Sequence, residues 1–292
     1  MSSLRLDGRT CVVTGASSGI GEATARGLAR LGARVVLVCR SRERGEQSLR
    51  RIAAAAGAGR AELALADLGS LDEVRRLADE LLERCPAIHV LVNNAGVVRL
   101  RRSVTRDGFE TTFAVNHLAH FALTCRLLPR LVASAPARIV NVASDAHRFG
   151  ALDLDDLQSE RGYNPMRVYG RSKSANILFT VELARRLGGS GVTANCLHPG
   201  AVSTGLGHSN LPAPLARAVS WVLHPLLKSP DEGARTSLHL ATAPELDGVS
   251  GRYFARSREA RAAAHALDPE RARRLWQRSA ELCSVDAVSP RV

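Results

Sequence analysis

The sequence has no hydrophobic run long enough to cross a membrane. Hydrophobic residues make up 45% of its 292 residues, yet no apolar stretch reaches the roughly 18 residues that a spanning helix needs. The first residues also lack the apolar stretch of a signal peptide. We therefore expect a cytoplasmic protein, or one that binds peripherally at a membrane surface.

The cysteines form no pattern that would bind a metal. Six are scattered along the chain, and no two of them form a C-x-x-C pair, so the sequence predicts no zinc site. Several lie within apolar runs, where cysteine behaves as a small hydrophobic residue. Unpaired cysteines of this kind are typical of a reducing compartment inside the cell.

Aromatic residues are few for a chain of this charge. The formal net charge is +12, but there are only three tyrosines and two tryptophans. The basic residues are spread along the sequence, and nucleic-acid binding usually needs a basic stripe with aromatic platforms. We interpret the charge as a solvated, arginine-rich surface and expect no nucleic-acid partner.

Short apolar runs alternate with helical patterns along the chain. Thr10–Thr14 and Arg34–Cys39 are typical of buried strands, and Glu22–Leu31 between them has helical spacing. Continuous apolar strands are typical of a parallel sheet that is covered on both faces. Further strands are predicted over Glu62–Leu65, Ile88–Val92, Arg138–Val142, Val192–Leu197 and Gly251–Phe254, and further helices over Asp72–Arg84, Gly108–Leu131 and around Tyr169.

This alternation predicts an α/β protein with a single-domain Rossmann fold. We expect a doubly wound, mostly parallel, seven-stranded sheet with helices on both faces. No internal repeat or linker divides the chain, so we expect one domain over residues 1–292, with a core of about 8–255. Residues 256–292 are arginine-rich and predicted to be helical, and we expect them to form an exposed tail or a helix that faces a partner.

A glycine-rich turn follows the first predicted strand. Gly15, Gly19 and Gly21 allow the backbone to approach a pyrophosphate, and the helix that follows offers free N–H groups to it. In a βαβ unit this pattern predicts a dinucleotide site. Other candidate residues follow later strands at the same carboxyl edge, where such sheets bind ligands: Arg40, Asp67, Asn94–Gly96, Ser144 and Pro199-Gly200.

The end of the second strand indicates which dinucleotide is bound. A carboxylate about 20 residues beyond the glycines would bind the ribose 2′-hydroxyl of NAD. The chain has Arg40 and Ser41 instead, with no acidic residue before Glu43. Because a guanidinium and a hydroxyl can both bind a 2′-phosphate, we expect NADP(H). Asp67 could bond the adenine amino group, with Leu68 donating its backbone N–H.

Tyr169 and Lys173 are four residues apart in a segment that can form one long helix. Residues at this spacing are neighbours on one helix face. A nearby ammonium lowers the pKa of a phenol from about 10, so that it can exchange protons with an alcohol or carbonyl oxygen. The same spacing also occurs by chance in surface helices, so the pair alone does not identify a site.

Four elements together resemble the short-chain dehydrogenase/reductase family. They are Thr14–Gly21, Asn93–Gly96, Ser144 ahead of the tyrosine–lysine pair, and Pro199-Gly200 with Thr204. The resemblance covers about residues 8–255. It implies a catalytic tetrad, which here would consist of Asn116, Ser144, Tyr169 and Lys173.

The resemblance also implies a role for each member of the tetrad. Tyr169 would donate or accept the proton, Lys173 would lower its pKa and hold the nicotinamide ribose, and Ser144 would bond the substrate oxygen. Asn116 would hold a water that links Lys173 to solvent. Taken singly, Ser144 could merely cap a helix and Asn116 could merely bond backbone. We expect His147 and His198, which are near the site, to be structural.

The same pattern implies a set of cofactor contacts along the carboxyl edge. The residues expected to make them are Gly15, Ser17, Ser18, Gly19, Ile20, Gly21, Arg40, Ser41, Asp67, Leu68, Asn94, Ala95, Gly96, Tyr169, Lys173, Pro199, Gly200, Val202 and Thr204.

A closer resemblance is to the retinol dehydrogenase branch of that family. It is carried by Cys39–Glu46, Val115–Leu118, Ser144–His147, Tyr169–Thr180 and Leu197–Gly200. Enzymes of this branch typically use NADP(H) on retinoids, other hydrophobic aldehydes or steroids. Many carry an N-terminal membrane anchor, which we expect this chain to lack.

Residues 206–230 combine apolar residues at helical spacing with Pro225. The segment could be a lid over a hydrophobic substrate, a peripheral contact with a membrane, or ordinary packing onto the fold. Our hypothesis is an NADP(H)-dependent oxidoreductase that acts on a hydrophobic alcohol or carbonyl compound such as a retinoid, lipid aldehyde or steroid. The alternative is a regulatory protein that binds NADP(H) without turnover. By resemblance alone, the helices at Gly108 and Tyr169 could form a homodimer.

Overall fold

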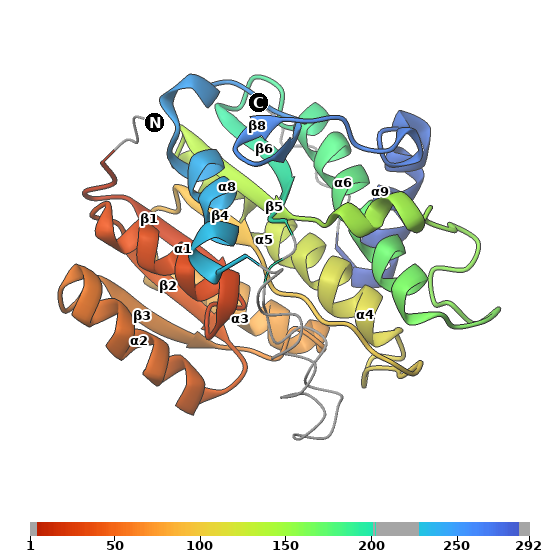
Figure 1. Ribbon diagram of the computed structural model, residues 1–292, viewed down its shortest axis with the longest axis horizontal. Coiled ribbons are helices and arrows are strands. Elements are labelled where there is room, and N and C mark those ends of the chain that lie inside the picture. Colours follow the sequence, from red (N-terminus) through yellow and green to blue (C-terminus); the bar gives the residue numbers. More distant parts are fainter. Residues whose placement is uncertain (1–4, 201, 203–227, 286–292) are drawn as a thin grey trace.

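A computed structural model describes residues 5–200, 202 and 228–285 of the chain. Its centre is one twisted sheet with helices on both faces, as the sequence predicts (Figure 1). The strand order is β3-β2-β1-β4-β5-β6-β7-β8. The strands are β1 (Thr10–Thr14), β2 (Arg34–Cys39), β3 (Ala61–Leu65), β4 (Val90–Asn93), β5 (Ala137–Val142), β6 (Val192–His198), β7 (Tyr253–Ala255) and β8 (Arg258–Glu259).

The sheet has eight strands in the described residues, so the prediction of seven is wrong. β8 pairs antiparallel with β7, and the other pairs are parallel. Arg256 and Ser257 between them adopt left-handed backbone angles, which close a tight hairpin. β8 contributes only two residues, both exposed, so it has no apolar periodicity by which a strand could be predicted.

The two helical layers bury alternate residues of the same strands. Val35 and Leu37 of β2 belong to one core cluster, whereas Val36 and Val38 belong to the other. This is why the strands read as continuous apolar runs. One layer contains α1 (Gly19–Arg30), α2 (Arg42–Ala56) and α8 (Pro230–Thr242), and the other contains α3 (Leu71–Arg84), α5 (Ala119–Ala133), α6 (Pro165–Arg186) and α9 (Pro269–Cys283).

The helix predicted over Gly108–Leu131 begins later and is not uniform. Gly108 has φ +83° and lies in a turn. Glu110 caps the new start, because its carboxylate accepts the N–H groups of Thr112 and Phe113 at 2.8 and 2.7 Å. One short helical turn, α4 (Thr111–Phe113), leads into a π-helical turn, η1 (Ala114–Leu118), and then into α5.

Residues 256–285, the described part of the C-terminal segment, are not an exposed tail, which corrects one alternative of the prediction, although the predicted helix is present. Its helix α9 packs against α6 and buries Trp276 to 1% exposure. The indole ring lies 4.9 Å from Phe121 and 5.8 Å from Phe179 between centroids, and the Arg186 guanidinium is 4.4 Å from it. The buried positions of α9 recur at helical spacing, and most of its arginines lie between them. The buried residues are Ala272, Leu275, Trp276, Ser279, Ala280 and Cys283.

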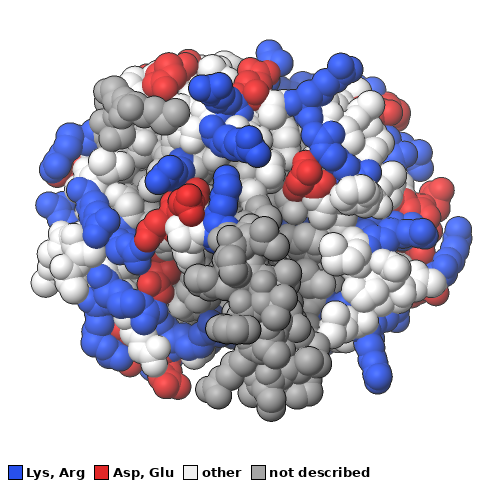
Figure 2. All heavy atoms as spheres, in the orientation of Figure 1, with Lys and Arg blue, Asp and Glu red and all other residues white. Residues whose placement is uncertain are grey.

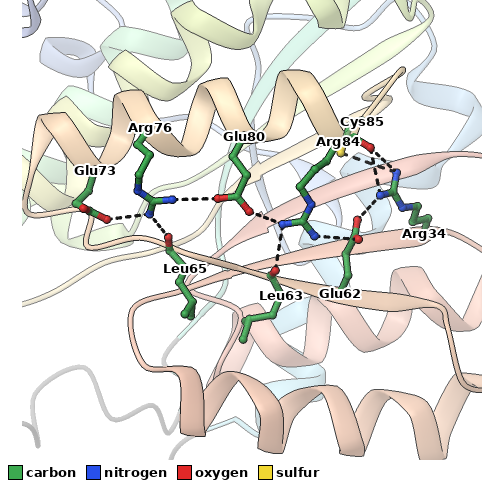
Figure 3. Close-up of polar contacts among 9 residues, drawn as sticks. All are labelled: Arg34, Glu62, Leu63, Leu65, Glu73, Arg76, Glu80, Arg84 and Cys85. Carbon is green, nitrogen blue, oxygen red and sulfur yellow. Dashed lines mark hydrogen bonds and ion pairs between the residues drawn. The ribbon is translucent and has the colours of Figure 1, made fainter.

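Arginines of α3 cover the edge strand β3 (Figure 3). Arg84 donates to the Leu63 carbonyl at 3.3 Å and pairs with Glu62 at 2.9 Å, and Arg76 donates to the Leu65 carbonyl. Edge strands with free backbone groups invite pairing with other chains. These guanidinium groups satisfy two such carbonyls, so fewer backbone groups of β3 remain free to pair with another chain.

The charges are mixed rather than gathered. Figure 2 shows Lys and Arg side chains spread over the visible face, with Asp and Glu among them. Many are ion-paired, for example Arg26 with Asp231 and Arg138 with Asp247. This fits the interpretation of the positive charge as a solvated surface.

Removing the Trp276 ring should test whether α9 is part of the folded core. We predict that Trp276→Ala lowers the free energy of unfolding by about 3–5 kcal/mol, because it leaves a cavity among buried aromatic side chains. Arg278→Ala, on the exposed face of α9, should change it by less than about 0.5 kcal/mol. Urea unfolding monitored by circular dichroism measures both. Equal small effects would mean that α9 does not pack as described.

Candidate active site

The candidate site lies at the carboxyl edge of the sheet, where the strand order reverses between β1 and β4. Chain connections leave this point in opposite directions, which opens a crevice outside the strand ends. β1 ends at Thr14, β4 at Asn93 and β5 at Val142. The residues that follow these strands are the ones that the sequence singled out.

The glycine turn after β1 is shaped to admit a ligand close to its backbone. Gly15 and Gly19 have φ of +67° and +57°, a backbone conformation that residues with a side chain rarely adopt. A Cβ on Gly21 would lie 2.3 Å from the Gly15 carbonyl oxygen. Ser18, the N-cap of α1, makes no side-chain cap hydrogen bond, so the helix N-terminus keeps N–H groups for an anion. These residues fit a dinucleotide pyrophosphate.

Thr14 fastens the loop after β4 to this turn, a role that sequence reasoning missed. Its hydroxyl accepts the N–H groups of Asn94 and Ala95 at 2.9 and 3.0 Å. The Asn94 amide in turn donates to the Thr14 carbonyl at 2.8 Å. The Asn94–Gly96 loop is therefore held beside the glycine turn, as its predicted cofactor role requires.

Tyr169 and Lys173 lie on α6, which starts at the Asn164 N-cap and Pro165. The Lys173 ammonium is 5.6 Å from the centroid of the Tyr169 ring. It donates to the Val142 carbonyl at the end of β5, at 2.9 Å, and the lysine is only 2% exposed. The predicted pair is thus brought together, with its cation anchored on the sheet.

The pKa of Tyr169 is raised and not lowered, which differs from the prediction. Burial raises the pKa of Tyr169, and a hydrogen bond with the Ser144 hydroxyl opposes that rise. Burial also lowers the pKa of Lys173 to about 8. One N–H of the ammonium donates to the Val142 carbonyl, and for Tyr169 desolvation outweighs the expected lowering of the phenol's pKa.

Ser144 follows β5 and starts the 3₁₀ turn η2 (Asp145–Phe149), where its hydroxyl accepts the Ala146 N–H at 3.2 Å. His147 holds this turn in place through both of its ring nitrogens. Its Nδ1 is 2.7 Å from the Ser144 carbonyl, and its Nε2 accepts the Ala263 N–H at 3.0 Å. His147 is therefore structural, as predicted, and it fixes the backbone that carries Ser144.

Asn116 lies in the π-turn and bridges two segments. Its Oδ1 accepts the Val97 N–H at 2.7 Å, and its Nδ2 donates to the Val97 carbonyl and to the Ser172 hydroxyl, each at 3.0 Å. A Cβ on Gly96 would lie 3.5 Å from Asn116 Oδ1 and 3.6 Å from Lys173 Nζ. The amide therefore braces the β4 loop against α6, close to the lysine.

The residues expected to select NADP(H) follow β2 and β3. Arg40 is exposed at the end of β2, and Ser41 caps α2 by accepting the Arg44 N–H at 3.3 Å. Asp67 Oδ1 accepts the Gly69 N–H at 2.9 Å, and Leu68 is buried. Arg40 thus lies at the carboxyl end of β2 with an exposed side chain, and its role in cofactor choice stays a prediction.

The last predicted contacts follow β6. Gly200 has φ +89° and donates its N–H to His198 Nδ1 at 3.1 Å. Val202 approaches Gly233 of α8 and forms a bridge to Lys228. Thr204 and most of residues 206–230 lie outside the described residues.

Comparison with known proteins agrees with this geometry. A sequence profile of the family described as short chain dehydrogenase matches residues 9–214. The chain belongs to the short-chain dehydrogenase family. Human retinol dehydrogenase 14 is 47% identical to it over 288 residues, which cover 93% of this chain and 85% of that protein. This places the chain in the retinol dehydrogenase-like branch, as predicted, and makes it an oxidoreductase.

Two solved structures of the same fold are similar over most of the chain. A protein from Mycobacterium paratuberculosis, described as uncharacterised, has a TM-score of 0.80 and 36% identity, covering 98% of this chain and 97% of its own. Pseudomonas aeruginosa RhlG, described as an NADP active-site complex, has a TM-score of 0.69 and 30% identity, covering 87% and 97%.

The buried lysine of this short-chain dehydrogenase gives a pH prediction. Its folded pKa of about 8 lies below the unfolded value of about 10.4, so its burial costs stability below pH 8, and that cost disappears as the pH rises towards 10.4. We predict that Lys173→Met stabilises the cofactor-free protein by at most about 3 kcal/mol at pH 7, and that this gain shrinks by pH 9.5. Thermal unfolding across this range measures it.

The matched control is Arg167→Met, which removes an exposed cation from the same helix. It should leave the pH dependence of stability unchanged. A Lys173→Met variant whose stability follows that of the wild type in parallel from pH 7 to 9.5 would contradict the lowered pKa.

Proposed function

We propose that the chain is an NADP(H)-dependent oxidoreductase that transfers a hydride between the nicotinamide and a hydrophobic alcohol or carbonyl compound. The observation that carries the proposal is the meeting of Ser144, Tyr169 and Lys173 at the carboxyl edge, beside a glycine turn that fits a dinucleotide. When bound, the nicotinamide supplies or accepts the hydride. The protein supplies orientation and the proton.

Each polar side chain has a task in this proposal. Tyr169 gives its proton to the developing alkoxide, or takes one from an alcohol, and Ser144 bonds the same oxygen. Lys173, held on the sheet by Val142, places a positive charge beside the phenol and within reach of the nicotinamide ribose. With its ammonium near, the phenolate left after proton transfer is less costly than it would be in the apolar crevice alone. Asn116 keeps the loop after β4 and helix α6 at a fixed spacing, and it helps to hold a water near Lys173.

The preference for NADP(H) rests on Arg40. An exposed guanidinium at the end of β2, followed in the sequence by no acidic residue before Glu43, is suited to a 2′-phosphate. The relative described with NADP in its active site is consistent with this choice.

Several exposed apolar side chains support a hydrophobic substrate. Among the described residues, the large hydrophobic side chains that remain exposed are Leu100, Val104, Phe149 and Met166. All four are close in sequence to candidate site residues: they lie in the loop beyond Gly96, the turn after Ser144 and the first turn of the Tyr169 helix. They could receive an apolar substrate or touch a membrane surface, and the name of human retinol dehydrogenase 14 points to the same substrate class.

We propose a cytoplasmic location, with peripheral membrane contact through residues 206–230 and these apolar side chains. No described helix is long and apolar enough to span a bilayer. The homodimer suggested by the resemblance would use the helices at Gly108 and Tyr169. Much of the surface of α6 is already packed against α9, so a dimer through that face would have to include α9.

Tyr169→Phe tests the proposed chemistry. We predict that turnover of NADPH with retinal, medium-chain aldehydes or steroid ketones falls at least about a hundredfold, because the proton donor is lost. NADPH binding, followed by its fluorescence, should change by less than about threefold. The control is Tyr163→Phe, whose hydroxyl donates to the Arg99 carbonyl at 2.9 Å, and it should retain activity. Full activity in Tyr169→Phe would refute the assignment.

Arg40→Ala tests the cofactor. We predict that the Kd for NADPH rises about 10–100-fold, since a charge-assisted hydrogen bond to the 2′-phosphate is worth roughly 1.5–3 kcal/mol. The Kd for NADH should hardly change. Arg50→Ala, which removes another exposed arginine from α2, serves as the control. An equal loss for both cofactors, or none, would remove Arg40 from the site.

A further inference from the structure

The π-turn η1 turns one residue toward the candidate site and the next toward the C-terminal helix. Asn116 bonds Val97 and Ser172 on the active-site side. His117 is fully buried, and its ring packs 5.1 Å from Phe113 and 6.0 Å from Phe179 between centroids. Single π-turns within helices are rare and often occur at functional sites. What holds this turn in place therefore affects Asn116 directly.

Two polar groups of α9 contact the turn. The Ser279 hydroxyl lies 2.8 Å from His117 Nε2, and the Cys283 thiol donates to the Leu118 carbonyl at 3.6 Å. Ser279 is fully buried and Cys283 is 2% exposed, so water cannot replace either contact. A buried ring nitrogen that loses its partner is desolvated without compensation, which favours one position of the turn relative to α9.

The same helix packs against the element that carries the tyrosine–lysine pair. Trp276 stacks on Phe179 and under the guanidinium of Arg186, both on α6. α9 therefore contacts the turn that holds Asn116 and the helix that holds Tyr169 and Lys173. A shift of α9 would change their relative position.

We infer that Ser279 is a positioning residue for Asn116, acting through His117, and that α9 clamps the two halves of the candidate catalytic group together. This inference rests on the proposed function for its kinetic consequence. Its structural part stands on the contacts alone. A misplacement of about 1 Å in such a group can slow a reaction about a hundredfold.

The test compares Ser279→Ala with Leu275→Ala in the full-length protein. Leu275 is a buried α9 residue without a polar contact to the turn, so its variant removes packing but leaves the hydrogen bond. We expect Ser279→Ala to lower kcat about tenfold while KM and the Kd for NADPH stay within twofold. Leu275→Ala should reduce thermal stability more but leave kcat within twofold at a temperature where it is folded.

Hydrogen exchange provides a second measurement that needs no turnover. In Ser279→Ala, amides of residues 114–118 should exchange at least fivefold faster than in the wild type, with strands β4 and β5 unchanged. Unchanged kcat and exchange in Ser279→Ala, or an equal fall of kcat in Leu275→Ala, would overturn the inference. A wild-type protein without turnover on any substrate would instead refute the proposed function, and the exchange result would still decide whether Ser279 holds the turn.

Discussion

The candidate site is organised around one buried ammonium, that of Lys173. Lys173 is almost completely removed from water, and one of its N–H groups donates to the Val142 carbonyl at the end of β5. A charged group in such a place is costly unless it is satisfied, so the hydrogen bond fixes α6 against the sheet edge. The depressed pKa of this lysine records that cost. A residue this expensive to bury is better explained by chemistry than by stability.

Close packing of small residues makes that arrangement possible. A Cβ on Gly170 would lie 2.6 Å from the Ala146 carbonyl oxygen, and one on Gly150 would lie 2.4 Å from the Arg171 nitrogen. Because neither position carries a side chain, α6 and the turn after Ser144 approach each other closely. This contact sets Ser144 beside Tyr169. His147 fixes the Ser144 backbone through its contact with the Ser144 carbonyl.

The buried His120 connects the helical side of the site to the glycine turn. His120 Nδ1 lies 3.1 Å from the Asn116 carbonyl, and its Nε2 lies 3.1 Å from the Thr14 hydroxyl. Thr14 in turn holds Asn94 and Ala95. Burial lowers the pKa of His120 to about 3, so it is a neutral connector and not an acid or base. The glycine turn, the β4 loop and the π-turn thus form one continuous network.

The sequence by itself determined the features that are set by local chain geometry. The glycine turn at Gly15–Gly21 and the spacing of Tyr169 and Lys173 are local patterns, and the alternation of strands and helices indicated the parallel sheet and its ligand-binding edge. Only the tertiary structure decided the rest. The π-turn at Asn116 and the two-residue strand β8 left no clear periodic signal. The helical spacing of the buried residues in α9 did not tell which elements α9 packs against, and His117 meets Ser279 across 162 residues of chain. Such contacts form because distant surfaces are complementary when packed, and neither segment specifies its partner alone.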